Sequence, residues 1–168
     1  KIIYNQINSG YGNALKKGIL NSTFENVIII DCDQTYKFSD AEILIDKFEL
    51  EEIDMIVGSR IKSIKERGKY FFSLKNIGRE FIRLFACFMT KKNIKDINSG
   101  LRIFKKEKFI KVHDFLPNGF SFTSSITCLF FQYEFNVVYQ DIEYLIRGGK
   151  SKIKPIKDFL NFINLIVK

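Results

Sequence analysis

The sequence predicts an α/β fold in which a mostly parallel sheet is flanked by helices. Short apolar runs rich in β-branched residues alternate with amphipathic segments, which is the order of elements in α/β domains. The run at residues 27–30 ends in Asp31-Cys32-Asp33, and a second run at residues 55–57 ends in Gly58-Ser59-Arg60. Uninterrupted apolar runs of this length are typical of strands buried on both faces. Such sheets bind ligands beyond the carboxyl ends of their strands.

The length and composition fit one globular domain. The chain has 168 residues, of which 46% are hydrophobic and 27% charged, so it can bury a core of its own. Lys1 to Tyr4 has the pattern of a strand already in progress, so we expect a piece of a longer polypeptide. No apolar run approaches the roughly 20 residues that cross a bilayer. Three widely spaced cysteines, Cys32, Cys87 and Cys128, predict reduced core thiols and a cytosolic setting.

The expected elements follow one another without repeats or low-complexity tracts. A helix over residues 11–20 follows the Ser9-Gly10 turn, and the strand at residues 27–30 comes next. Ser39 predicts the N-cap of a helix over residues 40–50, because Glu42 would complete a capping box. The remaining expected elements are strands at residues 55–58, 100–104 and 136–139, and helices at residues 72–89, 124–135 and 155–167.

The long helix expected over residues 72–89 has two distinct faces. Its apolar residues recur at spacings of three and four, whereas Lys75, Arg79 and Arg83 line another side. This pattern is typical of a helix that lies in a membrane surface, and equally of one that packs on a sheet. Both interpretations stay open from the sequence.

Asp31 and Asp33 are the first candidate site residues. If the chain is still extended where the strand ends, the two carboxylates project to the same side. Carboxylate oxygens are the ligands that Mg²⁺ and Mn²⁺ prefer, so the pair predicts a divalent-metal site that serves phosphate chemistry. A simple acidic turn after a strand is the alternative.

The charge is divided unevenly along the chain. Residues 1–59 carry five Lys and ten Asp or Glu, a net charge of −5, and residues 60–168 carry 22 Lys or Arg and nine Asp or Glu, a net charge of +13. A basic surface of this kind suits a phosphorylated substrate, anionic lipid headgroups or nucleic acid. A basic surface that only keeps the protein soluble is the alternative.

Five segments, in order along the chain, carry a shared pattern. They are Gly10-Tyr11-Gly12-Asn13-Ala14 with Gly18, Asp31-Cys32-Asp33-Gln34-Thr35-Tyr36, Gly58-Ser59-Arg60, Asp96-Ile97-Asn98-Ser99-Gly100-Leu101-Arg102 and Arg147-Gly148-Gly149-Lys150-Ser151-Lys152. Together they resemble the family-2 glycosyltransferases of GT-A type. Within that family they are similar to the polyprenyl-phosphate branch, whose members include dolichyl-phosphate mannose synthase-like enzymes.

The resemblance implies an inverting, metal-dependent hexosyltransferase. In such an enzyme Asp31 and Asp33 would hold Mg²⁺ or Mn²⁺, and Gly12 and Gln34 would contact the nucleotide-sugar donor. Asp96 would be the catalytic carboxylate, either as a general base for a hydroxyl acceptor or as an orienting group for a phosphate that is already an anion. The residues that the resemblance assigns to the acceptor or to phosphate are Arg60, Lys75, Ser99, Arg147, Lys150 and Ser151.

The chain departs from the family pattern at two places. The first βαβ unit, which helps to bind the nucleotide base in the family, has no counterpart before Lys1, so we expect a single, partial glycosyltransferase domain over residues 1–168. Lys75 stands where relatives usually carry an arginine before the long helix. A lysine offers phosphate a point charge in place of a planar fork.

The leading interpretation is transfer of a sugar from a nucleotide sugar to polyprenyl (dolichyl or undecaprenyl) phosphate. It implies a cytoplasmic enzyme of cell-envelope synthesis, peripheral to an anionic membrane surface or tethered by segments outside this chain. The alternatives are a saccharide hydroxyl acceptor in polysaccharide or glycan synthesis, and a non-catalytic basic binding domain. Nucleic acid is disfavoured as a partner, because the acidic part of the chain lies where chemistry would occur and no strand interleaves aromatic with basic residues.

Overall fold

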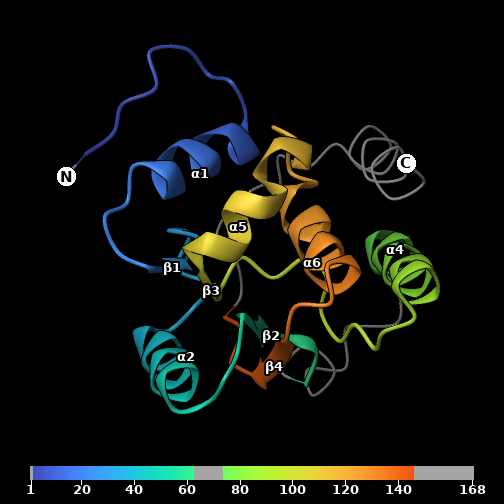
Figure 1. The fold of residues 1–168 in the computed structure, drawn as a ribbon. Coiled ribbons are helices and arrows are strands. Elements are labelled where there is room, and N and C mark those ends of the chain that lie inside the picture. Colours follow the sequence, from blue (N-terminus) through green and yellow to red (C-terminus); the bar gives the residue numbers. More distant parts are fainter. Residues whose placement is uncertain (1, 63–73, 146–168) are drawn as a thin grey trace.

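The sheet has four strands whose order brings distant parts of the sequence together (Figure 1). The computed structural model describes residues 2–62 and 74–145, so the helix expected at residues 155–167 lies outside the described residues. The strands, in their order across the sheet, are β1 (Asn26–Ile29), β3 (Arg102–Lys105), β2 (Met55–Ser59) and β4 (Val137–Asp141).

One strand of the four runs against the others. β3 is antiparallel to both β1 and β2, and β2 is parallel to β4. The carboxyl ends of β1, β2 and β4 therefore lie at one end of the sheet. Arg102, the first residue of β3, pairs with Ile29 and Val57 at that same end. The loop that enters β3 thus meets the loops that leave β1, β2 and β4.

Helices cover both faces of the sheet. α2 (Phe38–Leu50) packs on one face, and α1 (Tyr11–Leu20), α5 (Lys106–Val112) and α6 (Phe122–Gln132) lie over the other. Neighbouring residues of a strand point to opposite faces, so Ile56 joins the cluster under α2 while Met55 and Val57 join the larger cluster on the opposite face. Burial on both faces explains why the first three residues of β2 are all apolar.

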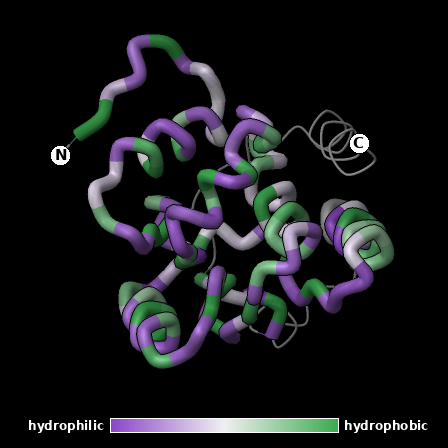
Figure 2. Tube along the Cα trace, viewed as in Figure 1, coloured by the Kyte–Doolittle hydropathy of each residue, from purple (hydrophilic) through white to green (hydrophobic). Residues whose placement is uncertain are grey.

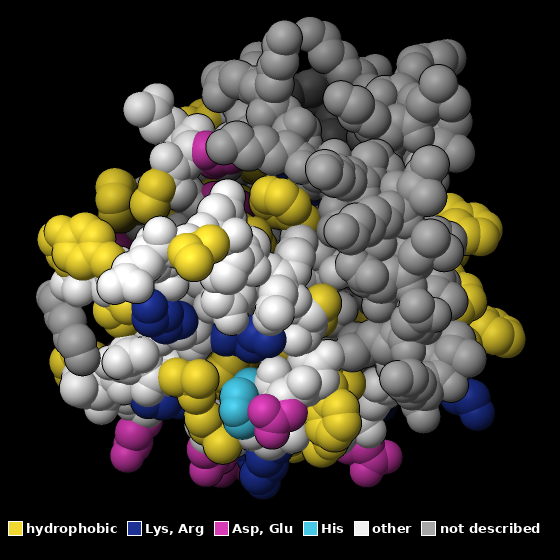
Figure 3. Space-filling model, turned by 90° about the horizontal axis from the view of Figure 1, so that it is seen from above, with side chains coloured by type: hydrophobic (Ala, Val, Ile, Leu, Met, Phe, Trp, Pro, Cys, Tyr) yellow, Lys and Arg dark blue, Asp and Glu magenta, His cyan; other side chains and the backbone are white. Residues whose placement is uncertain are grey.

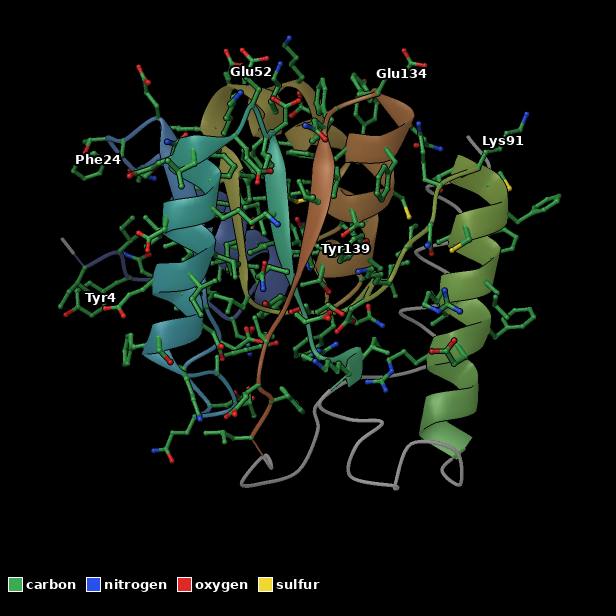
Figure 4. The ribbon with its side chains drawn as sticks, turned by 90° about the horizontal axis from the view of Figure 1, so that it is seen from below. Tyr4, Phe24, Glu52, Lys91, Glu134 and Tyr139 are labelled. Carbon is green, nitrogen blue, oxygen red and sulfur yellow. The ribbon has the colours of Figure 1, made fainter. Side chains whose placement is uncertain are left out.

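The helix α4 (Leu74–Thr90) lies outside α6 and divides its apolar residues between two environments. Ile82, Phe85 and Met89 pack against a third cluster, made of Ala86, Ile94, Ile97, Cys128 and Phe131. Phe81, Leu84 and Phe88 point outward and are 59%, 57% and 79% exposed. Side chains of α4 reach away from the sheet in Figure 4, and hydrophilic and hydrophobic residues alternate along the helix in Figure 2.

No helix within the described residues is long and apolar enough to cross a membrane. On the face seen in Figure 3, basic, acidic and hydrophobic side chains are interspersed among the described residues. The described residues on that face therefore do not form a patch of one sign.

Several predicted local features are wrong. α2 begins at Phe38 with Lys37 as N-cap, so Ser39 lies inside the first turn and makes no capping hydrogen bond, and the capping box with Glu42 does not form. Residues 2–4 form no strand, because none of the described strands pairs with them. Cys32 is exposed and is no core thiol, since β1 has already ended at Ile29.

Other predicted boundaries agree closely with the structure. α1 spans the predicted residues, and β1 and β2 differ from their predicted bounds by one residue. The short α5 and the 3₁₀ turn η1 (His113–Phe115) were not predicted. α5 has only two buried residues, Phe109 and Val112, which is too few for a helical period to be visible in the sequence.

Candidate functional site

The candidate site lies at the end of the sheet where β1, β2 and β4 finish and β3 begins. Four of the five motif segments reach this end: the start of α1, the turn after β1, the Gly58-Ser59-Arg60 end of β2, and the loop into β3. The segment after β4 also arrives here, because the amide of Leu145 donates to the carbonyl oxygen of Thr35 over 3.0 Å. The reversed direction of β3 is what adds residues 96–101 to this group.

Asp31 is held from two sides. The hydroxyl of Tyr11, at the start of α1, donates to Oδ1 of Asp31 over 2.9 Å. The other oxygen, Oδ2, lies against Gly100, where a Cβ atom would overlap it. Burial, followed by the charge of Asp31 and the hydrogen bond to it, raises the pKa of Tyr11 well above its usual value, so the phenol stays protonated as a donor.

Asp33 lies in the turn that follows. Its Oδ1 accepts hydrogen bonds from the backbone amide of Thr35 (3.3 Å) and from the Thr35 hydroxyl (2.5 Å). Gln34 has a φ of 61° and is exposed, so the backbone turns sharply between the two. The chain is no longer a strand after Ile29, and Asp31 and Asp33 are both half-buried at the surface of this end of the sheet.

Asp96 is buried in an ion pair with Arg60. Nε of Arg60 lies 2.7 Å from Oδ2 of Asp96, Nη2 lies 2.9 Å from Oδ1, and the amide of Arg60 also donates to Oδ2. Burial alone would raise the pKa of Asp96, but the charge and hydrogen bonds of Arg60 outweigh it and hold that pKa below its usual value. A carboxylate bound in this way is a weak proton acceptor.

The loop before β3 is fixed by polar contacts on both sides. The hydroxyl of Tyr36 accepts the amide of Gly100 over 2.7 Å. The buried guanidinium of Arg102 donates to the carbonyl oxygens of Ser99 and Thr123 and to the Thr127 hydroxyl, which ties the loop to α6. The loop therefore presents a rigid backbone to Asp31.

The predicted acceptor and donor residues fall into three groups. Arg60 is 8% exposed, and Ser99 is fully buried with its hydroxyl turned toward the backbone of Leu101. Gly12 lies against the backbone of Pro117, where a Cβ would overlap the carbonyl oxygen. Arg147, Lys150, Ser151 and the side chain of Lys75 lie outside the described residues, and all these roles stay predictions.

Three residues that shape the candidate site were given no role from the sequence. Tyr11 and Tyr36 stand inside two of the quoted motifs, but a motif does not show which atoms their hydroxyl groups meet. Gly100 also belongs to a quoted motif, and its importance comes from its closeness to Asp31, 69 positions away. The glycine itself was the one available signal, since glycine permits close approach.

The oxygen donors at this end of the sheet fit a small, hard cation. Mg²⁺ typically takes one or two carboxylates from a protein and completes its octahedron with water and substrate phosphates, which suits the pair Asp31 and Asp33. Among residues 2–62 and 74–145, no group of three or more His, Cys, Asp or Glu side chains is arranged to hold a metal ion.

The mixed sheet with helices on both faces is that of the GT-A fold class, and an Asp-x-Asp turn follows its first strand, β1. β1 is an edge strand of the described sheet and only Ile29 in it is buried, so the prediction of a strand buried on both faces at residues 27–30 is wrong. The chain belongs to glycosyl transferase family 2, whose family model matches residues 1–112.

The chain is also similar to named proteins. The chain is 30% identical over 105 residues to dolichyl-phosphate beta-glucosyltransferase of Dictyostelium discoideum and 32% identical over 108 residues to the protein of that name in Homo sapiens. Each match covers 60% of this chain and 32% of the relative. Glycosyltransferase AglJ of Haloferax volcanii is 24% identical over 156 residues, covering 91% of this chain and 50% of the relative. The chain thus spans a third to a half of these relatives.

The fold is also that of solved structures. Glucosyl-3-phosphoglycerate synthase from Mycobacterium tuberculosis, in complex with Mn²⁺, UDP-glucose and phosphoglyceric acid, superposes with a TM-score of 0.69 at 12% identity. The match covers 94% of this chain and 55% of the synthase. The same synthase has been solved with Mg²⁺ and UDP.

Proposed function

We propose that this chain is part of a glycosyltransferase that moves a sugar from a nucleotide-sugar donor to a polyprenyl phosphate at the cytoplasmic face of a membrane. The observation that carries the proposal is that the Asp31–Asp33 turn, Arg60 and the loop before β3 lie at the same end of the sheet. Two relatives named for dolichyl phosphate support the acceptor.

Donor binding rests on the turn after β1. A magnesium or manganese ion held by Asp31 and Asp33 would neutralise the negative charge that develops on the leaving diphosphate. Gln34, which follows Asp33 directly and is exposed, is proposed to contact the donor. Gly12 would act through backbone shape, since it brings the start of α1 against residues 117–119.

Acceptor binding follows from charge. A lipid phosphate is already an anion, so it can attack the anomeric carbon without a general base. Asp96 is bound by Arg60 and has a lowered pKa, which suits an orienting role. It holds the guanidinium in place and does not accept a proton from the acceptor. The predicted phosphate contacts Arg147, Lys150 and Ser151 follow Leu145, which is hydrogen-bonded to the metal turn through Thr35.

Inversion at the anomeric carbon is the expected stereochemistry. UDP-glucose carries its sugar in α linkage, and the two dolichyl-phosphate relatives are named as beta-glucosyltransferases. A single displacement by the acceptor phosphate would invert the linkage. The proposal for this chain is therefore a direct attack with no covalent sugar–enzyme intermediate.

Contact with the membrane is proposed for the outer face of α4. Phe81, Leu84 and Phe88 form an exposed apolar row one to two helical turns long, and Lys91 and Lys92 follow it at the surface. Arg83 is turned away from this role, because its guanidinium binds Glu80 and the carbonyl oxygen of Ile94. An apolar row with adjacent lysines suits an anionic lipid surface.

Liposome binding by the full-length protein tests this face. Replacing Phe81 and Phe88 by Ser should weaken salt-sensitive binding to anionic vesicles, since two large apolar side chains are lost from the contact. Phe38→Ser is the matched control, because Phe38 is 83% exposed on a different helix. Equal loss with the control variant would contradict the assignment to α4.

The transfer assay tests the function as a whole. The full-length enzyme should form a sugar-linked lipid from dolichyl phosphate and a nucleotide sugar, with UDP-glucose tried first, and a chelator should abolish the product. Transfer only to saccharide hydroxyl groups would replace the lipid acceptor by the saccharide alternative. A protein that binds phosphorylated ligands and transfers no sugar would be the non-catalytic alternative.

A further inference from the structure

The start of α1 packs closely against the short loop that follows η1. Gly10 has a φ of 101°, and a Cβ on either Gly10 or Gly12 would overlap the backbone of residues 117–118. The amide of Asn13 donates to the carbonyl oxygen of Asn118 over 3.2 Å. The two glycines thus let one helix start and one loop pack backbone against backbone.

Tyr11 stands between these two glycines and is oriented by the same loop. Its ring stacks on Phe120, with centroids 5.2 Å apart and planes inclined by 15°. The stacked ring aims the hydroxyl at Oδ1 of Asp31, 2.9 Å away. The stack on Phe120 and the helix backbone already restrict the Tyr11 side chain, so it loses little further conformational entropy when it donates this hydrogen bond.

Both oxygens of the Asp31 carboxylate consequently have a close neighbour. Oδ1 accepts a hydrogen bond from Tyr11, and Oδ2 occupies the space that a Cβ atom on residue 100 would need, which only a glycine there leaves open. A half-buried aspartate without such contacts would sample several rotamers. Ligands whose orientation is set in advance bind a metal more tightly, and partners of metal ligands are worth about 10- to 100-fold in metal affinity.

We propose that Tyr11 is a positioning residue for the metal-binding carboxylate of Asp31, and that the Pro117–Phe120 loop holds Tyr11 in place for this task. The inference rests on the proposed function, in which Asp31 and Asp33 bind a divalent cation. It adds a residue on α1 and a loop before α6 to the parts of the chain that determine metal affinity.

Manganese binding by the full-length protein tests this role without any sugar transfer. Free Mn²⁺ is measured by electron paramagnetic resonance in the absence of donor. Tyr11→Phe keeps the stacked ring and removes the hydroxyl, so the Kd for Mn²⁺ should rise about tenfold. Its melting temperature without metal should stay within a few degrees of the wild-type value. Tyr133→Phe, at the C-terminal end of α6, is the matched control and should bind Mn²⁺ as the wild type does.

Phe120→Leu and Asp33→Asn separate the possible outcomes. Phe120→Leu keeps the Tyr11 hydroxyl and loses the stack, so a smaller rise in Kd supports the role of the loop. If Asp33→Asn abolishes Mn²⁺ binding while Tyr11→Phe binds as tightly as the wild type, the positioning role is overturned and the metal site stands. If Asp33→Asn and the wild type bind Mn²⁺ equally, the proposed metal site fails, and this inference fails with it.

Discussion

Asp31 and Asp96 lie at the same end of one sheet, but their surroundings differ in charge and in exposure. Asp31 is half-buried and accepts a hydrogen bond from a neutral phenol, whereas Asp96 is 1% exposed and is bound by the guanidinium of Arg60 through two N–H groups. A neutral donor orients a carboxylate and leaves its negative charge available for a cation. An arginine neutralises that charge in an ion pair. The comparison supports the proposal of metal binding at Asp31 and of a structural and orienting role for Asp96.

The largest expected effect is the loss of activity when Asp33, in the turn after β1, is replaced. Asp33→Ala in the full-length enzyme should lower sugar transfer by about a thousandfold, because one of two protein ligands to the cation is lost. The fold should be intact, as judged by circular dichroism, because Asp33 lies in a surface turn. Wild-type activity that persists in chelator would remove metal from the mechanism.

The converse effect on stability is expected at Asp96. Asp96→Ala leaves Arg60 buried without its carboxylate, which should lower the free energy of unfolding by about 3–5 kcal/mol. Asp33→Ala should lower it by less, about 1 kcal/mol in the same urea titration, because it removes the acceptor of the Thr35 hydrogen bonds but leaves no buried charge unpaired. Similar losses for both variants would erase the distinction between the two regions.

A smaller change at Asp96 separates orientation from proton transfer. Asp96→Asn keeps the size and one acceptor oxygen for Arg60, so transfer to polyprenyl phosphate should fall by no more than about tenfold. Loss of a general base would cost about 100-fold or more. The assay uses saturating nucleotide sugar, and abolished transfer to a saccharide hydroxyl would instead favour the alternative acceptor.

The smallest expected effect is the pH dependence of the same pair. The pKa of Asp96 is lowered in the folded protein, so its ionised form stabilises the fold above the unfolded-state pKa of about 3.9 and this stabilisation is lost as the pH falls through the folded-state pKa. The difference in unfolding free energy between wild type and Asp96→Asn should be constant from about pH 8 to 5 and shrink below about pH 4. A difference that shrinks between pH 7 and 6 would indicate a raised pKa and a general base.

The two regions were not equally predictable from the sequence. The strand that precedes Asp31 and the helix that carries Tyr11 follow local patterns, so their predicted bounds agree with the structure to within a residue. The Arg60–Asp96 pair and the contact of Asp31 with Gly100 depend on the reversed direction of β3. A mostly parallel sheet was expected, and apolar periodicity does not distinguish the direction in which a buried strand runs. The order of the motifs therefore predicted which segments form the site, and only the topology determined which atoms meet.

The contact between Asp31 and Gly100 links the proposed metal binding to the completion of folding. α1 and β1 are neighbours in the sequence. The Asp31 carboxylate meets Gly100 only after the loop from Asp96 to Leu101 has packed against the turn after β1. Contacts between residues so far apart in sequence form late, because closing the intervening chain costs entropy before any contact repays it. If the proposed metal site is correct, a refolding chain should recover its helices before its affinity for the cation, and tight metal binding should mark the molecules in which β3 has paired with β1 and β2.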